Sequence, residues 1–266
     1  MNNNKNHPVE IEIIFHKATV DSNKSPIVFI HGAYVAAWCW DEFFLSYFAD
    51  NGHDVYAFSL RGHGESGGYN QTAWTSLNDY VDDLHHVIST IDGDPIIIGH
   101  SMGGMILQKY LENHSCKAAV LMASVPCEGL LAPTLTMAAL HPQNFFFFQA
   151  THYLGQNAIT PMLGQRALFH REMHPAEVQK YLSRMQSVSL RALHDMSWLS
   201  LPRKHNPNNI PMLVLAAEND ALFSVSSQRK TALAYNAEFE SFPDMSHAMM
   251  LEPEWQRVAD KIISWA

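Results

Sequence analysis

The sequence has little positive charge. It contains 17 lysine and arginine residues against 26 aspartate and glutamate residues, a formal net charge of -9, and no segment gathers its basic residues into a cluster. Nucleic acids and anionic lipid surfaces both attract proteins through clustered basic side chains. We therefore expect neither nucleic acid nor an acidic membrane surface among the partners of this protein.

Cysteine is also scarce, with three residues that form no Cys-x-x-Cys pair: Cys39, Cys116 and Cys127. A disulfide framework and a thiolate zinc site both need more cysteines at closer spacings. The first ten residues are polar and rich in asparagine, where a signal peptide would carry a continuous apolar core. These features predict a cytoplasmic protein.

Long hydrophobic runs are absent from the sequence. The longest apolar stretches, such as residues 118–123, fall far short of the roughly 20 residues that span a bilayer. The overall composition is nevertheless 47% hydrophobic and 16% charged, which is enough apolar material for a large core. We expect no membrane span, and one large domain or one domain with an insertion. The oligomeric state is left open.

Short apolar runs alternate with longer segments of helical periodicity along most of the chain. This alternation is typical of β-α-β units, and nearly continuous apolar runs are typical of strands covered on both faces. We predict an α/β fold in which helices flank a mostly parallel central sheet. The expected strands are 9–15, 27–30, 55–60, 96–98, 119–122, 212–216 and 238–242, and the expected helices are 40–51, 77–91, 103–113, 226–234 and 254–266.

Residues 126–207 break this alternation. They contain no convincing strand, are rich in methionine and aromatic residues, and are divided by proline and glycine into short helical stretches. We predict a helical lid inserted between the sixth and seventh strands, over a core of residues 1–125 and 208–266. The expected helical pieces lie near 134–139, 143–153, 176–187 and 189–199.

The strongest chemical signal is Gly-His-Ser-Met-Gly at residues 99–103, between an expected strand and an expected helix. The pattern Gly-x-Ser-x-Gly in this context is typical of a nucleophile elbow. The tight turn strains the serine backbone, and the flanking glycines let the helix pack against the strand. Ser101 is therefore the candidate nucleophile.

A nucleophilic serine needs a base, and the base needs a carboxylate that orients it. His247 is chosen among the 16 histidines because it precedes the last expected helix. Asp220 follows the expected strand 212–216 and is the candidate orienting acid. Glu128 and Glu218 remain alternative acids. The order serine, aspartate, histidine differs from the orders of trypsin-like and subtilisin-like proteases.

The candidate oxyanion hole follows the expected strand 27–30. We assign its two N–H groups to Ala33 and to Met102, the residue after the nucleophile, and expect Gly32 to allow close approach of the substrate. For His31 we favour a structural role, with its ring packed beneath the loop and hydrogen-bonded to backbone.

Together these segments resemble the α/β-hydrolase superfamily over essentially the whole chain apart from the lid. The oxyanion segment, which ends in Trp38-Cys39-Trp40, is similar to the ester-hydrolase and hydroxynitrile-lyase branch. The loop Arg-Gly-His-Gly-Glu-Ser at residues 61–66 is more similar to bacterial esterases, peroxidases and C–C hydrolases. The resemblance implies the α/β-hydrolase fold. Ser101 stands where epoxide hydrolases and haloalkane dehalogenases of this fold carry aspartate, which disfavours those two activities.

Neither a cofactor nor a metal is predicted. Residues 62–67 fit Gly-x-Gly-x-x-Gly after a strand, but a dinucleotide site requires that motif to open a helix, and residues 68–71 are expected to continue as a loop. His170 and His174 are four residues apart, but Glu172 is misplaced for a zinc motif and Pro175 interrupts the helix. We expect both histidines to be ordinary surface residues.

The predicted function is that of a serine hydrolase that cleaves a small, largely apolar carboxylic ester or lactone through an acyl-enzyme. Phe146 and Phe147, in a run of four phenylalanines, either line the acyl pocket or form lid core. The same three residues could also act on another bond, in a C–C hydrolase, a thioesterase or a cofactor-free perhydrolase. A ligand-binding module without turnover is the alternative from another class.

Overall fold

The computed structural model describes residues 9–20, 23–154, 161–169, 173–204 and 209–266. A seven-stranded sheet forms the centre of this part of the chain, with the order β1-β3-β2-β4-β5-β6-β7. Strand β1 runs antiparallel to β3, and every other neighbouring pair is parallel. The strands are β1 (Ile13–His16), β2 (Ile27–Ile30), β3 (Val55–Phe58), β4 (Ile96–His100), β5 (Ala118–Met122), β6 (Met212–Ala217) and β7 (Glu238–Phe242).

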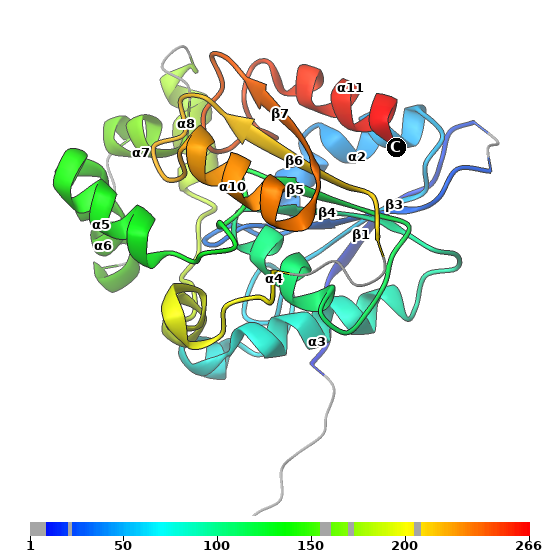
Figure 1. Cartoon of the computed structure of the whole chain (residues 1–266), viewed down its shortest axis with the longest axis horizontal. Coiled ribbons are helices and arrows are strands. Elements are labelled where there is room, and N and C mark those ends of the chain that lie inside the picture. The colour runs from blue at the N-terminus through cyan, green and yellow to red at the C-terminus, as the bar shows by residue number, and fades with distance from the viewer. Residues whose placement is uncertain (1–8, 21–22, 155–160, 170–172, 205–208) are drawn as a thin grey trace, which may run out of the picture.

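Helices cover both faces of the sheet. Helices α2 and α11 lie on one side, and α3, α4 and α10 lie on the other (Figure 1). Every residue of β2, β4, β5 and β6 is buried, which explains why these strands are almost continuously apolar. The flanking helices are α1 (Trp38–Asp41), α2 (Phe44–Asp50), α3 (Leu77–Ile88), α4 (Met102–Tyr110), α10 (Val225–Tyr235) and α11 (Trp255–Trp265).

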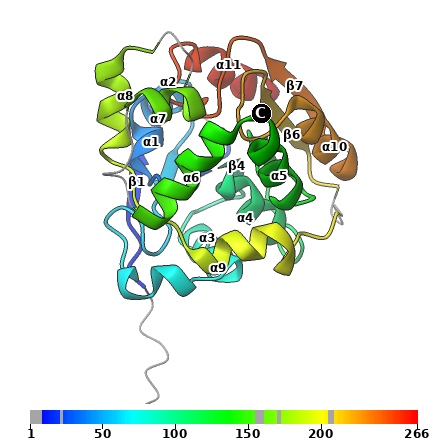
Figure 2. The ribbon, with the colours of Figure 1, turned by 90° about the vertical axis from the view of Figure 1, so that its left-hand side faces the viewer.

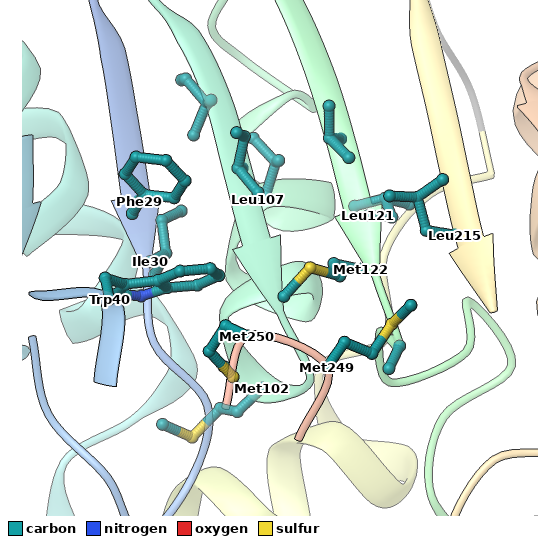
Figure 3. Close-up of a cluster of buried hydrophobic side chains, with 14 of the residues drawn as sticks. Phe29, Ile30, Trp40, Met102, Leu107, Leu121, Met122, Leu215, Met249 and Met250 are labelled. Carbon is teal, nitrogen blue, oxygen red and sulfur yellow. The ribbon is translucent and has the colours of Figure 1, made fainter. Parts of the chain in front are cut away.

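The hydrophobic core extends to the end of the sheet where the parallel strands finish. Phe29 of β2 packs beside Trp40, with ring centroids 4.8 Å apart. Met102, Met249 and Met250 lie together near the ends of the strands (Figure 3), and each is at most 1% exposed. This packing places a rigid apolar floor beneath the loops that leave the sheet.

The segment between β5 and β6 is helical, as predicted. Figure 2 shows its helices side by side in front of the sheet, and in Figure 1 the arrow of β6 points towards this side of the molecule. The helices are α5 (Leu131–Leu140), α6 (Pro142–Leu154), α7 (Pro161–Leu168), α8 (Pro175–Leu182) and α9 (Leu190–His194), which continues into the π-helical turn η3 (Asp195–Leu199).

The number of the strand before this segment was predicted incorrectly. The segment follows the fifth strand of the described sheet rather than the sixth. Residues 9–20 contribute one strand, β1, ahead of β2, so five strands precede the segment, as in the strand ranges expected from the sequence. Helix α7 was not anticipated from the sequence.

Two elements near the N-terminus are shorter than predicted. Strand β1 begins at Ile13 rather than at residue 9. The Glu12 carbonyl still accepts the amide of Ser59, directly after β3, but the Glu10 carbonyl accepts the amide of Gly67 instead of continuing this pairing. The single helix expected over 40–51 is divided into α1 and α2, and Phe43, between them, has the non-helical φ of -145°.

None of the helices in the described ranges is both long and apolar enough to cross a bilayer.

Candidate active site

Ser101 occupies a sharp turn between β4 and α4. Its backbone has φ 52° and ψ -115°, a conformation that non-glycine residues rarely adopt. Three amides hold the Ser101 carbonyl, those of Gly104 and Val125 at 3.0 Å and that of Met105 at 3.3 Å. These hydrogen bonds hold the strained turn in place. The Ser101 side chain lies at the carboxyl end of the sheet.

The flanking glycines are required by close backbone approach. A Cβ atom at Gly99 would lie 2.5 Å from the Gly103 carbonyl oxygen, and one at Gly103 would lie 2.4 Å from the Ile30 carbonyl oxygen. No side chain can rotate away to relieve these contacts, because both partners are backbone atoms. Both Gly99 and Gly103 must therefore be glycine for this turn to form.

His247 and Asp220 form a buried pair. His247 Nδ1 lies 2.8 Å from Asp220 Oδ2, and their side chains are 4% and 1% exposed. The other carboxylate oxygen of Asp220 accepts the amides of Leu222 at 2.7 Å and Phe223 at 3.1 Å. Because the aspartate accepts the Nδ1 proton, His247 Nε2 is left as the ring's basic nitrogen.

The two alternative acids lie elsewhere. The Glu128 side chain is 49% exposed, and its Oε1 lies 3.8 Å from Lys204 Nζ. Glu218 is exposed and accepts a hydrogen bond from Ser241 Oγ at 2.8 Å. In the described structure the carboxylate in contact with His247 belongs to Asp220.

His100 is a site residue to which the Gly-x-Ser-x-Gly pattern assigns no role, since it occupies a variable position of that pattern. Its Nε2 donates a hydrogen bond to the His247 carbonyl at 2.9 Å, and the two rings lie 4.8 Å apart. Burial, and secondarily the neighbouring His247, lower the pKa of His100 well below its ordinary value of 6.5. His100 is therefore a neutral ring that anchors the backbone of His247 to the end of β4. No local sequence signal indicates this contact, because the two residues are 147 positions apart.

The loop after β2 approaches Ser101 closely. A Cβ atom at Gly32 would lie 2.8 Å from His100 Nδ1 and 3.0 Å from Ser101 Cβ, so glycine is required here. Gly32 itself lines neither cavity described below, so its close approach is to the serine turn rather than to a cavity. The amides of Ala33 and Met102 have no backbone acceptor among the described residues, and both residues line the cavity above Ser101.

His31 has the structural role that was favoured. Its Nδ1 donates to the Gly32 carbonyl at 2.7 Å, and its Nε2 accepts the Leu60 amide at 3.0 Å. Burial, followed by the nearby His63, lowers the pKa of His31 from 6.5 to about 3. The neutral ring thus joins the loop after β2 to the end of β3.

A cavity of about 340 Å³ opens above Ser101. The sheet side contributes Ala33, Ser101 and Met102, and the helical segment contributes mainly apolar side chains. Among these are Met137, Phe145 and Phe148. A second, smaller cavity of about 70 Å³ lies beside it and is lined by both Ser101 and His247.

The predicted pocket residue Phe146 lies outside these cavities. It is 68% exposed, whereas Phe145 and Phe148 of the same helix line the large cavity. Residues three apart share one face of a helix, and Phe146 is rotated by roughly 100° from Phe145. The side chain of Phe147 lies outside the described part of the structure.

The glycine loop at residues 62–67 is closed on itself. The Gly62 amide donates to the Gly67 carbonyl at 2.8 Å, and Gly67 donates to Glu10 at 2.9 Å. The turn that follows, expected to be loop, is the 3₁₀ helix η1 (Tyr69–Trp74). The predicted surface residue His174 is exposed and caps α8 by accepting the Ala176 amide, while His170 lies outside the described residues.

A mostly parallel sheet with a strained serine turn at its carboxyl end and a His–Asp pair beyond β6 and β7 defines a hydrolase-type α/β protein. The Alpha/beta hydrolase family model matches residues 27–261. The chain therefore belongs to the α/β-hydrolase family.

Known relatives extend over nearly the whole chain. A monoacylglycerol lipase of Mycolicibacterium smegmatis is 23% identical and covers 96% of this chain and 92% of its own length. A non-heme chloroperoxidase of Burkholderia pyrrocinia is 25% identical, covering 89% of this chain and 90% of its own length. Among solved structures, Est816, described as an N-acyl homoserine lactone degrading enzyme, superimposes with a TM-score of 0.73. It shares 19% identity, over 98% of this chain and 99% of its own.

Proposed function

We propose that the protein is a carboxylic-ester hydrolase in which Ser101 is the nucleophile, His247 the general base and Asp220 the residue that orients the base. The observation that carries the proposal is the buried contact of 2.8 Å between His247 Nδ1 and Asp220 Oδ2, next to the strained turn of Ser101. The relatives named as a lipase and as a lactone-degrading enzyme support an ester or a lactone as substrate class.

The proposed reaction proceeds through an acyl-enzyme. Ser101 Oγ attacks the substrate carbonyl carbon while His247 Nε2 takes the hydroxyl proton, and the amides of Ala33 and Met102 donate to the oxyanion. His247 then returns the proton to the leaving alcohol as the C–O bond breaks. Water, deprotonated by His247, attacks the acyl-serine, and the carboxylic acid leaves as Ser101 regains its proton. Asp220 keeps His247 in the required tautomer and stabilises the imidazolium.

In this proposal residues 126–207 act as a lid over a core of residues 1–125 and 208–266. Met137, Phe145 and Phe148 support it, because these side chains face the cavity above Ser101 from the helical segment. Their chemistry favours a largely apolar acyl group. The reaction uses the residues named here and requires neither a metal nor a cofactor.

The test is labelling of the purified protein with a fluorophosphonate, combined with a panel of p-nitrophenyl esters, lactones and thioesters. The wild type should be labelled at Ser101 and hydrolyse at least one ester or lactone, and Ser101→Ala should lose labelling and turnover. The alternative activities are tested with three further kinds of substrate. These are thioesters for a thioesterase, diketones with a cleavable C–C bond for a C–C hydrolase, and peroxide with a carboxylate for a perhydrolase. Activity confined to one of these would replace ester hydrolysis as the function.

Ser197→Ala is the matched control, because Ser197 lines the same cavity but donates its hydroxyl to the Leu193 carbonyl at 2.7 Å. This variant should keep labelling and turnover. A protein that binds apolar ligands yet is never labelled would be a binding module on the hydrolase fold, and the proposal would be wrong.

A further inference from the structure

Two cavities of very different size meet at Ser101. The large one measures about 340 Å³ and the small one about 70 Å³. The wall between them consists of residues that line both cavities: Ala33, Tyr34, Ser101, Phe148 and Leu222. A substrate whose carbonyl carbon reaches Ser101 would therefore have one arm in each cavity.

The two cavities differ in the groups that the proposed chemistry uses. The small cavity is lined by His247 and His100, and the helical segment contributes Leu168 and Met185 to its lining. The large cavity is lined by Met102 and not by His247. Only the small cavity therefore contacts the imidazole that gives up a proton.

This difference indicates which cavity holds the alcohol of the ester and which holds its acyl chain. The leaving oxygen must receive its proton from His247, so the alcohol departs on the side of His247. The acyl chain continues from the carbonyl on the other side of Ser101, beside the Met102 amide. The alcohol therefore lies in the small cavity and the acyl chain in the large one.

The volumes of the two cavities limit the lengths of the alcohol and of the acyl chain. The small cavity measures about 70 Å³ and therefore takes the shorter arm of the ester. The large cavity has nearly five times that volume and a largely apolar wall. A long alcohol would have to displace Leu168 or Met185, which line the small cavity.

We infer that the enzyme prefers esters that join a short alcohol to a bulky, apolar carboxylic acid and discriminates against long-chain alcohols. The inference rests on the proposed ester hydrolysis at Ser101 and adds the direction in which the substrate binds. Met185, which lines the small cavity and not the large one, would set the limit on the alcohol, whereas Met137, which lines the large one and not the small one, would contact the acyl chain.

The test uses two isomers of equal composition and hydrophobicity, ethyl hexanoate and hexyl acetate, with acid release followed in a pH-stat. Ethyl hexanoate should have a kcat/KM at least about tenfold higher, because each buried methylene adds roughly fourfold and only the large cavity can bury the six-carbon arm. Equal values, or a preference for hexyl acetate, would overturn the inference.

The matched variants are Met185→Ala and Met137→Ala, which remove the same side chain from positions 4% and 9% exposed. Met185→Ala should reduce the preference for ethyl hexanoate by at least about fourfold, and Met137→Ala should lower activity on ethyl hexanoate without improving that on hexyl acetate. The opposite pattern in folded variants would reverse the assignment. If no ester is hydrolysed and Ser101 is not labelled, the proposed function fails; if esters are hydrolysed without the preference, only the assignment of the cavities fails.

Discussion

The sheet side and the helical side of the large cavity differ in how deeply their residues are buried and how their positions are held. On the sheet side, Ser101 and His247 are 7% and 3% exposed and are held by backbone contacts. On the helical side, α6 contributes Phe148 to the cavity while Phe146, two residues earlier, is 68% exposed. Helix α5 also leaves Leu135 and Leu140 62% and 68% exposed.

This difference predicts that the two sides of the cavity tolerate substitutions to different degrees. Backbone approach around the serine turn leaves no room for a side chain, so the geometry there tolerates little change. The helical side contacts the cavity through side chains that can be exchanged without moving the sheet. We therefore expect changes on the sheet side to affect chemistry and stability, and changes on the helical side to affect substrate preference.

The largest effect should follow from the loss of the acid that orients His247. Asp220→Asn retains shape but removes the charge, and we expect kcat to fall at least about 100-fold, as expected for a lost orienting carboxylate. Glu128→Gln, in the helical segment, should change kcat by less than about tenfold. Steady-state kinetics on one p-nitrophenyl ester measures both. A reversed result would place the acid on the helical side and contradict the comparison.

The next effect is on stability. Gly103→Ala places a Cβ atom 2.4 Å from the Ile30 carbonyl oxygen, so α4 must move away from β2. We expect a loss of about 3 kcal/mol in the free energy of unfolding, measured by urea titration.

Gly164→Ala is the matched change in α7 of the helical segment. There the Cβ atom would lie 2.5 Å from Leu182 Cδ1, the far end of a flexible side chain. The gain in helix propensity, about 1 kcal/mol, should offset most of the cost. Equal losses in the two variants would show that the sheet side is no more constrained than the helices.

A smaller effect should appear when the pH is lowered. Burial is the main cause that lowers the pKa of His31 to about 3 and that of His63 to about 4, from 6.5. The unfolded chain then binds more protons than the folded one below pH 6.5. The contribution of each neutral ring to the free energy of unfolding is complete above that pH and is lost as the pH falls towards 4. The loss is about 2 kcal/mol per ring at pH 5.

The measurement is the difference in unfolding free energy between pH 7.5 and pH 5. This difference should be smaller in His31→Gln than in the wild type. His86→Gln, an exposed change on α3, should leave it as it is in the wild type. An unaltered difference in His31→Gln would show that His31 does not contribute to it.

The smallest effect should come from the helical side. Phe148→Ala removes a ring that lines both cavities, so we expect the preference for ethyl hexanoate over hexyl acetate to fall by about fourfold, the value of one methylene. Phe146→Ala should change it by less than twofold. Equal changes in the two variants would mean that the exposed residue also contacts substrate.

Much of the sheet side could be predicted because its signals are local. Ser101 lies in a pattern whose spacing follows from steric exclusion, and apolar runs mark the strands that both helix layers cover. Asp220 was preferred to Glu128 from its place after a strand, and only the 2.8 Å contact with His247 distinguishes them. The helical side was predicted less well. A run of four phenylalanines has no apolar periodicity, so the sequence could not indicate which rings face the cavity.

The sequence by itself determined the order of the seven strands along the chain and the turn that presents Ser101, because both depend on neighbours within a few residues along the chain. The tertiary structure decided three other features: the hydrogen bond from His100 to the His247 backbone, which side of α6 faces the cavity, and the division of the space above Ser101 into a large and a small cavity. Each of these depends on residues far apart in sequence, whose approach is set by the packing of helices on the sheet rather than by any local pattern.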